Sequence, residues 1–504
     1  MLAWTIYIPL TAGLALLLMR PRSAALARWT SLVAALVTVG IAAASMGQFI
    51  GPAAKLTTIV KVPWIPQLGI QYYLAADGIS ITLVLLTSIA AFVGILFSWN
   101  VEHRASEFFA LYLILIGAVF GVFLSFDVFL LFAFYELAII PKYFLVAIWG
   151  STRREYGAMK LVIYSFLGSA LVLVGMIAVY ATLPLPTFDM AVWAQTAFPR
   201  PFQLWVFPFV FVGFAVLAGM WPFHSWAPTG HVAAPTAASM LLAGVVMKLG
   251  AYGALRVGMA LFPEGARYWA PWIGWLAVIG IVYGALIALV QKDFKFVIGY
   301  SSVSHMGFVL LGLASLNLVG MSGAVLQMFS HGIIAGLLFA VVGRMVYDRA
   351  HTRDLDALEV MGLAKEIPFA AGIFGVAIFA SMGMPGFSGF VAEMQVLVGA
   401  WNASPTLALL AGFGILAGVG FSLRVLHKSF LGASASPSRR RRHDHGAGHG
   451  HGKMEPISTQ EGLGGIILVA CTLIVGLYPA CLLDLIVPAL KAPFFEALLR
   501  PLIK

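Results

Sequence analysis

The segment Trp221–Gly253, WPFHSWAPTGHVAAPTAASMLLAGVVMKLGAYG, combines mostly apolar residues with three prolines and one lysine, Lys248. Proline removes a backbone donor and breaks a helix. In hydrocarbon, such a break is tolerated only where protein or a water-lined cavity satisfies the freed backbone groups. The segment therefore predicts a broken membrane helix followed by a helix that buries an amine. This combination is typical of an ion path.

The whole chain shares this apolar character. Of its 504 residues, 61% are hydrophobic and only 10% are charged, and apolar runs recur from end to end. Because one span takes about 20 apolar residues, we expect an all-α polytopic membrane protein with about 14 transmembrane helices. We interpret Leu2–Met19 as the first span, because it lacks the basic start and the small-residue cleavage pattern of a signal peptide.

The basic residues indicate the orientation of the chain. Lys and Arg gather in alternate loops, such as Arg20–Arg28, Arg153–Lys160 and Arg439–Arg442, and the intervening loops are poorer in them. Such basic loops face the cytoplasm. We therefore expect a multi-pass protein of the cell inner (plasma) membrane with both termini on the periplasmic side. The net charge of +10 is explained by these loops and does not indicate nucleic acid as a partner.

A second break is predicted in the apolar run 367–401, at Gly383–Met384–Pro385–Gly386. It resembles the first break, and the two lie five helices apart, so they would have opposite orientations. Paired breaks of this kind indicate inverted repeats with a site near the bilayer midplane. We accordingly divide the chain into N-terminal helices one to three (1–107), a first repeat of helices four to eight (108–262), a second, inverted repeat of helices nine to thirteen (263–430), a basic His-rich cytoplasmic loop (431–460) and a C-terminal helix (461–504).

Five ionisable residues fall inside the predicted spans, namely Glu136, Lys248, His305, His331 and Glu393. Each lies about 12–18 Å along its helix, near the middle of a core about 30 Å thick. A single charge at the bilayer centre costs about 2.5–3.5 kcal/mol even on a lenient scale. Five at one depth are therefore difficult to explain as structural groups. Acids, an amine and imidazoles at one level can pass protons along, so we expect a proton path.

These residues stand in segments that resemble a known family, the antiporter-like membrane subunits of respiratory complex I. The similar segments are Trp221–Gly253 with Lys248, FAFYELAIIPKYFLVAIWG with Glu136, SSVSHMGF with His305, MFSHG with His331, and GMPGFSGFVAEM with Glu393. Glu393 and the loop YDRAHTRD (Tyr347–Asp354) make the chain most similar to subunit M of the proton-pumping NADH:quinone oxidoreductase. The resemblance extends from about Asp77 to about Lys428.

The resemblance implies that the five residues form the proton path and that two five-helix repeats surround it. It also implies that the other membrane-arm subunits, the lipid bilayer and protons are the partners of this chain. The sequence shows neither a cysteine cluster nor a dinucleotide fingerprint. We therefore expect no cofactor and no metal on this chain, and we expect NAD, FMN, iron–sulfur clusters and quinone on partner subunits.

One position departs from the family. Its members usually have a lysine in helix seven, four residues before the position of Trp221, where this chain has Leu217. Lys142 follows Glu136 by six residues, about 9 Å along the same helix. One hypothesis is that Lys142 replaces the missing lysine as the partner of Glu136. The alternative is that Lys142 extends to the cytoplasmic surface. A further change places Thr229–Gly230 where Asp–Ala is common.

The remaining polar residues have plainer interpretations. We expect His224 and His231 to satisfy the broken helix ends by hydrogen bonds. The segment Pro437–Lys453 could bind Zn or Ni through four histidines, but alternating His and Gly favours a basic loop that faces lipid. Three aspartates near helix ends are expected to be exposed, namely Asp77, Asp127 and Asp484.

Four functions are compatible with these features. The first is a proton-translocating subunit of an NADH:quinone oxidoreductase, which belongs to an enzyme although this chain carries no redox centre. The second is a subunit of a multisubunit Na⁺/H⁺ antiporter, which Glu393 and the loop Tyr347–Asp354 disfavour. The third is the membrane arm of a hydrogenase related to complex I. The fourth is a structural spacer that pumps no protons, which Leu217 keeps open.

Overall fold

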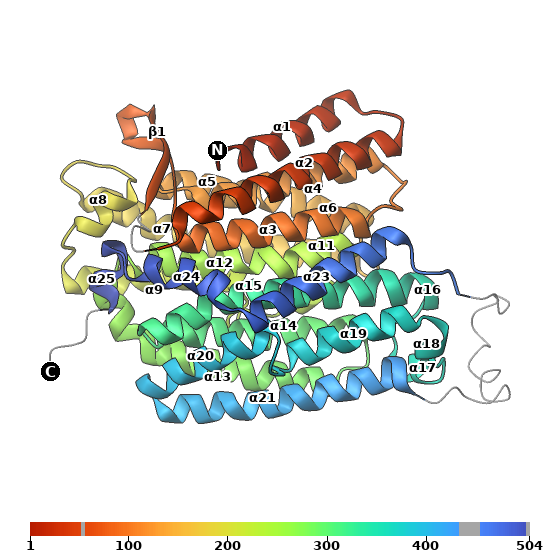
Figure 1. Ribbon diagram of the computed structural model, residues 1–504. Helices are drawn as coiled ribbons and strands as arrows, with labels where there is room; N and C mark the ends of the chain where they lie inside the picture. Colours follow the sequence, from red (N-terminus) through yellow and green to blue (C-terminus); the bar gives the residue numbers. More distant parts are fainter. Residues whose placement is uncertain (52–55, 433–453, 500–504) are drawn as a thin grey trace.

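A computed structural model describes residues 1–51, 56–432 and 454–499. Long helices lie side by side across the molecule (Figure 1). Within these ranges, 12 helices are long and apolar enough to cross a membrane, and Trp4–Met19, Pro368–Ser381 and Ala480–Leu490 are shorter apolar helices. The chain is thus an all-α polytopic membrane protein, as predicted. The number of about 14 spans, the inverted relation of the repeats and the five-part division stay predictions.

The N-terminal half of the chain contains twelve α-helices before the long helix α13, within the described ranges. They are α1 (Trp4–Met19), α2 (Ala24–Met46), α3 (Gly78–Phe97), α4 (Ala105–Leu124), α5 (Val128–Leu137), α6 (Ile139–Trp149), α7 (Arg154–Thr182), α8 (Met190–Gln195), α9 (Arg200–Ala218), α10 (Trp226–Ala233), α11 (Thr236–Leu241) and α12 (Met247–Gly253). Two π-helical turns, Leu242–Val246 and Ala254–Met259, flank α12, so that α11 to the second turn form one apolar segment, Thr236–Met259.

The C-terminal half begins at α13. Its helices are α13 (Pro263–Val290), α14 (Phe294–Ala314), α15 (Leu318–Ala340), α16 (Asp348–Ala350), α17 (Leu355–Glu359), α18 (Leu363–Glu366), α19 (Pro368–Ser381), α20 (Ser388–Ala403), α21 (Pro405–Leu426), α23 (Thr459–Leu477), α24 (Ala480–Leu490) and α25 (Pro493–Leu499). The short helices α16 to α18 lie at one end of the bundle, and α8 and α25 lie at the other (Figure 1).

A β-hairpin that the sequence patterns did not predict projects from the end that carries α8 and α25 (Figure 1). Its antiparallel strands are β1 (Thr57–Ile65) and β2 (Ile70–Ala76), and Gly69 between them has a φ of 65°. Asp127 lies buried beneath the hairpin, where it accepts a hydrogen bond from the amide of Gln71 at 3.0 Å. The prediction of an exposed Asp127 is wrong, and burial raises the pKa of this carboxyl group to about 6.

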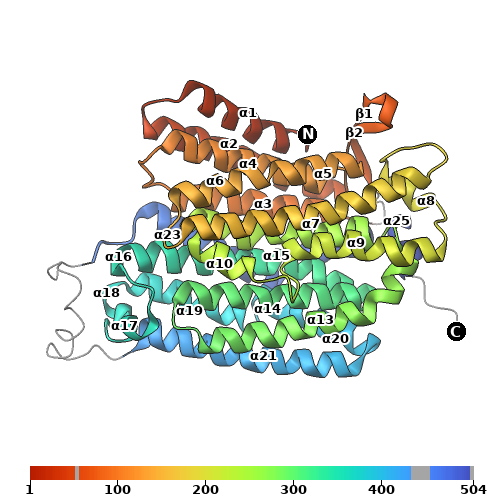
Figure 2. The same ribbon diagram turned by 180° about the vertical axis from the view of Figure 1, so that it is seen from behind.

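Both predicted breaks are present. The chain leaves the helical conformation after α9 and again between α10 and α11, and it does so a third time between α19 and α20, over Met382–Phe387. The short helix α10 lies against α7 and α14 (Figure 2). Gly383 and Gly386 in the second break have φ values of 73° and 97°, which glycine adopts more readily than other residues.

Protein groups satisfy the backbone at the first break, as buried backbone groups require. Three carbonyls at the end of α10 accept hydrogen bonds from distant segments: that of Val232 from Arg353 at 3.1 Å, that of Ala233 from the amide of Ser151 at 2.8 Å, and that of Ala234 from Lys295 at 3.0 Å. Arg353 belongs to the loop Tyr347–Asp354. The loop therefore holds the first broken helix in place.

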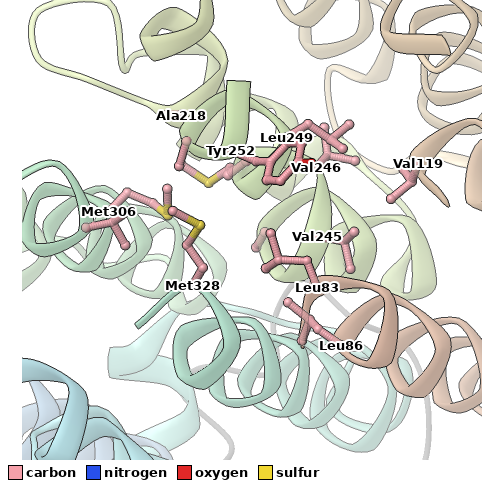
Figure 3. Close-up of a cluster of buried hydrophobic side chains, with 14 of the residues drawn as sticks. Leu83, Leu86, Val119, Ala218, Val245, Val246, Leu249, Tyr252, Met306 and Met328 are labelled. Carbon is pink, nitrogen blue, oxygen red and sulfur yellow. The ribbon is translucent and has the colours of Figure 1, made fainter. Parts of the chain in front are cut away.

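The hydrophobic core surrounds α12. Figure 3 shows Val245, Val246 and Leu249 beside Leu83 and Leu86 of α3, with methionines from α14 and α15 close by. These side chains are buried. Apolar packing on this scale fixes the helix that carries Lys248 against its neighbours.

A buried ion pair joins the start of α3 to the end of the Lys248 segment. Arg256 contacts Asp77 at 2.7 Å, and both side chains are almost fully buried. The guanidinium group also lies 5.3–5.7 Å from the ring centroids of Tyr252, Phe126, Phe494 and Phe495. The prediction that Asp77 is exposed is therefore wrong, because the apolar ends of several helices close over it. Asp484 is exposed, as predicted.

Breaking this pair on one side should destabilise the protein strongly. We expect Arg256→Met to lower the free energy of unfolding by about 3–5 kcal/mol, because it leaves an uncompensated buried carboxylate. A denaturant titration of the purified protein in detergent measures this. The double variant Asp77→Asn/Arg256→Met should recover much of the loss. Arg104→Met, which breaks the exposed pair with Glu107, should cost less than about 1 kcal/mol. If Arg256→Met and Arg104→Met lower the free energy of unfolding equally, the buried carboxylate of Asp77 does not need Arg256 as its partner.

Candidate functional site

Lys248 lies fully buried on α12, between the two π-helical turns. Its ammonium group donates to the carbonyl of Ala243 at 2.5 Å and contacts Nδ1 of His331 on α15 at 2.8 Å. An ammonium group has three donors and no acceptor, so Nδ1 of His331 accepts while the lysine is charged. π-helical turns are frequent at functional sites, which agrees with a functional amine at this position.

The two histidines of the predicted path are neighbours. The rings of His331 and His305 have centroids 5.3 Å apart and planes inclined by 31°. His331 comes from α15 and His305 from α14. Two imidazoles at this separation can exchange a proton through one intervening group or after a small side-chain movement.

Both nitrogens of His305 are occupied. Nδ1 contacts Oε1 of Glu393 on α20 at 2.9 Å, and Nε2 contacts the hydroxyl of Ser381, the last residue of α19, at 3.1 Å. Because an ionised carboxylate only accepts, Nδ1–H donates to Glu393 in that state, and the neutral ring can accept from Ser381. Gln327 on α15 adds a second donor to Oε1 of Glu393, at 3.2 Å.

Four of the five predicted residues therefore form one succession of neighbouring side chains, from Lys248 through His331 and the partly buried His305 to Glu393. We refer to these four residues as the central chain. Their common depth in the membrane stays a prediction from the spacing along each helix. The sequence patterns did not indicate the partners that complete the chain, Gln327 and Ser381, although Gln327 stands four residues before His331 and thus on the same helix face.

The fifth predicted residue, Glu136, lies apart from the central chain. It is half-buried near the end of α5, it interacts with Ser169 and with the charge of Lys142, and its Oε1 is buried without a hydrogen-bond partner. Among the described residues, no hydrogen bond or ion pair connects Glu136 to Lys248. Glu136 thus interacts electrostatically with Lys142 and, among the described residues, is not hydrogen-bonded to the central chain.

Lys142 lies on α6, and only 1% of the residue is exposed. The alternative that Lys142 extends to the surface is therefore wrong. Its role as the partner of Glu136 stays a hypothesis, supported by their electrostatic interaction. Leu217 on α9 is also buried, and its carbonyl carbon lies 3.0 Å from the place that a side chain at Gly250 would take. The backbone of Leu217 therefore adjoins α12 at Gly250, which follows Lys248 by two residues.

The two histidines near the first break do not behave alike. His231 is fully buried, and neither ring nitrogen has a hydrogen-bond partner; the ring packs against Trp226 and Phe339. The prediction that His231 satisfies the broken helix end is wrong, because Arg353 and Lys295 do so instead. His224 does interact with the backbone of Pro222, although its Nδ1 has no partner.

Within the described ranges, no group of three or more His, Cys, Asp or Glu side chains could hold a metal ion. The predicted loop Pro437–Lys453, with His443, His445, His449 and His451, lies outside the described residues. The free cysteines Cys471 and Cys481 belong to α23 and α24. The site therefore offers proton donors and acceptors: carboxylates, an amine, imidazoles and hydroxyl groups.

Comparison with known proteins gives a consistent result. Residues 125–418 match the family described as "NADH:quinone oxidoreductase/Mrp antiporter, TM". The chain is 36% identical to "NADH-quinone oxidoreductase subunit M" of Rhodobacter capsulatus over 476 residues, 92% of this chain and 89% of the relative.

Two solved structures share the fold over nearly the whole chain. A chain of respiratory complex I from Thermus thermophilus with bound NADH has a TM-score of 0.86 and 26% identity, covering 99% of this chain and 100% of that one. A chain of the Mrp complex from Dietzia sp. has a TM-score of 0.84 and 21% identity, covering 99% of both, which shows a common fold alone.

The second break offers a direct test of the geometry around Glu393. Oε2 of Glu393 lies 3.0 Å from the place of a Cβ atom at Gly383, whose φ of 73° also disfavours other residues. We expect Gly383→Ala to destabilise the protein by about 1–2 kcal/mol and to displace Glu393. Gly372→Ala in α19 meets open space and should leave stability unchanged or improved. Denaturant titration in detergent compares the stabilities of the two variants. Equal stabilities would contradict the close approach of Glu393 to Gly383.

Proposed function

The chain belongs to the NADH:quinone oxidoreductase/Mrp antiporter transmembrane family, and we propose that it is the proton-translocating subunit M of an NADH:quinone oxidoreductase. In this proposal, the central chain carries protons within the membrane while electron transfer takes place on other subunits. The parent complex is an oxidoreductase, and this chain supplies the ion movement. The observation that carries the proposal is the line of neighbouring side chains that leads from Lys248 through the adjacent rings of His331 and His305 to Glu393.

The chemistry of the contacts supports this function. A protonated Lys248 faces the acceptor nitrogen of His331, so a proton can pass to the imidazole without a change of helix position. His305 then faces an acid, Glu393, which can take a proton from Nδ1. Surrounding apolar packing keeps bulk solvent from this route, which a proton pump requires in order to avoid leakage.

Glu136 and Lys142 form the second part of the proposal. They would act as a separate acid–amine pair whose charges influence each other through a medium of low dielectric. In this view Lys142 replaces the lysine that the family usually has where this chain has Leu217. A change of protonation at this pair would alter the electrostatic potential at Lys248, and so drive protons along the central chain.

The proposal assigns the redox groups and the remaining contacts to other molecules. NAD, FMN, iron–sulfur clusters and quinone would reside on partner subunits, and this chain would contact other membrane-arm subunits and lipid. The basic loops support a cytoplasmic location for the end with α16 to α18. The start of α1 and the helix α25 would then face the periplasm, since α1 runs from the N-terminus toward the opposite end (Figure 1).

Experiments distinguish the proposed function from the three other functions that the sequence allows. A Na⁺/H⁺ antiporter subunit shares the fold, and the fold alone decides nothing about function. A hydrogenase membrane arm would have the same path with another electron donor. A structural spacer would have no need for an unbroken central chain.

The lysine of the central chain gives the decisive prediction. We expect Lys248→Ala to reduce NADH-driven proton pumping by about tenfold or more in vesicles that contain the whole complex, because it removes the first proton donor of the chain. Lys365→Ala, which changes an exposed lysine, is the matched control and should pump normally. Normal pumping by assembled Lys248→Ala complex would favour the structural spacer. Na⁺ uptake in place of H⁺ movement would favour the antiporter.

A second prediction concerns Lys142. Lys142→Met should lower the number of protons pumped per electron, because Glu136 loses its amine partner. Lys491→Met, a control at an exposed position, should leave this number unchanged. The double variant Lys142→Met/Leu217→Lys returns an amine to the position that the family uses and should restore part of the pumping. Unchanged pumping by Lys142→Met would remove Lys142 from the path and leave the central chain untouched.

A further inference from the structure

Gln327 is a buried amide at the end of the central chain. It lies on α15, and 1% of it is exposed. Its Nε2 is 3.2 Å from Oε1 of Glu393 and 3.5 Å from Nδ1 of His305. Its own Oε1 is buried without a hydrogen-bond partner. An unpaired buried carbonyl is unfavourable, so packing alone gives no reason for an amide at this position, where an apolar side chain of equal length would fit.

The donors around Glu393 explain the amide. Two N–H groups, one from His305 and one from Gln327, converge on the same carboxylate oxygen. Nδ1 of His305 cannot accept from Gln327 while it donates to Glu393, so the amide of Gln327 is directed to the carboxylate. A carboxylate oxygen has room for both donors. The amide of Gln327 on α15 therefore restrains Oε1 of Glu393 in addition to His305 on α14.

The two oxygens of Glu393 consequently have different surroundings. Oε1 faces His305 and Gln327, whereas Oε2 lies against Gly383 in the second break. Rotation about the last side-chain bond of Glu393 would exchange them. Two donors from α14 and α15 oppose this rotation better than one. The proton from His305 thus meets a defined oxygen, and the other oxygen stays turned to the break.

We propose that Gln327 is a positioning residue of the proton path, which holds Glu393 with Oε1 on His305 and Oε2 toward Gly383. The inference rests on the proposed function of the central chain. Gln327 does not carry the proton. It fixes the carboxylate that receives it, and without it His305 transfers protons to a carboxylate that turns more freely.

Other charged groups near α20 do not take over this role. From α14 and α15, His305 and His331 face the site, and His331 is in turn beside Lys248. On α21, Arg424 donates to the carbonyl of Gln291. On α23, Glu461 is held by Arg344 and Arg349. From α19, Ser381 contacts His305 and carries no charge.

The test compares two glutamines in the whole complex. Gln327→Met keeps the length of the side chain and removes the amide, and Gln395→Met makes the same change two residues after Glu393, on a glutamine that contacts Ser322 instead. Redox-induced infrared difference spectra follow the C=O stretch of protonated Glu393, identified by its loss in Glu393→Gln. Proton pumping in vesicles is measured on the same samples.

We expect Gln327→Met to shift the Glu393 band, because the hydrogen bond that Gln327 donates to Oε1 of the carboxyl group is lost, and to reduce pumping by about threefold or more. Gln395→Met should change neither. A Gln327→Met complex with unchanged band and pumping overturns the proposal and leaves the proton path intact. Normal pumping by Glu393→Gln overturns the path itself. If Gln327→Met does not assemble, Gln327→Asn withdraws the amide by one methylene and should also shift the Glu393 band.

Discussion

Most buried polar groups need a partner from the protein, and this constraint accounts for several contacts that distinguish the chain. It places donors from Arg353 and Lys295 on the free carbonyls of α10. It pairs Arg256 with Asp77 at the ends of the helices. The same constraint brings the ammonium group of Lys248 to His331, a contact that the proposed proton path uses.

The two parts of the proposed path meet this constraint unequally. In the central chain, hydrogen bonds join Lys248 to His331 and His305 to Glu393, and the two imidazole rings are neighbours, whereas Oε1 of Glu136 and the hydroxyl of Tyr135 are buried without hydrogen-bond partners. The difference coincides with Leu217, the position where the family usually carries an amine. An apolar side chain there offers no polar group to α12, which the backbone of Leu217 adjoins at Gly250. The electrostatic link between Glu136 and Lys142 then has to act over a distance and not through direct contact.

Much of this arrangement could be predicted from the sequence, since helix periodicity and span length fix depth. Lys248, His305, His331 and Glu393 were placed at one level by counting residues along their helices. Contacts between helices were beyond such counting, which explains why Gln327 and Ser381 were missed and why His231 was given a hydrogen-bonding role that Arg353 fulfils. Asp77 and Asp127 were expected outside because they precede helices. The cover over them comes from residues distant in the chain, such as Phe494 and the β-hairpin.

The second break shows how an interruption can build a site. Ser381 and Glu393 both contact His305, one at each ring nitrogen. They are twelve residues apart, a separation that a continuous helix would turn into about 18 Å. No single imidazole could then bind both. By leaving the helical conformation between Ser381 and Ser388, the chain brings the end of α19 and the second turn of α20 to one ring. The glycines of the break are therefore needed for a geometric reason: they allow the turn that places an acid and a hydroxyl group on the same histidine.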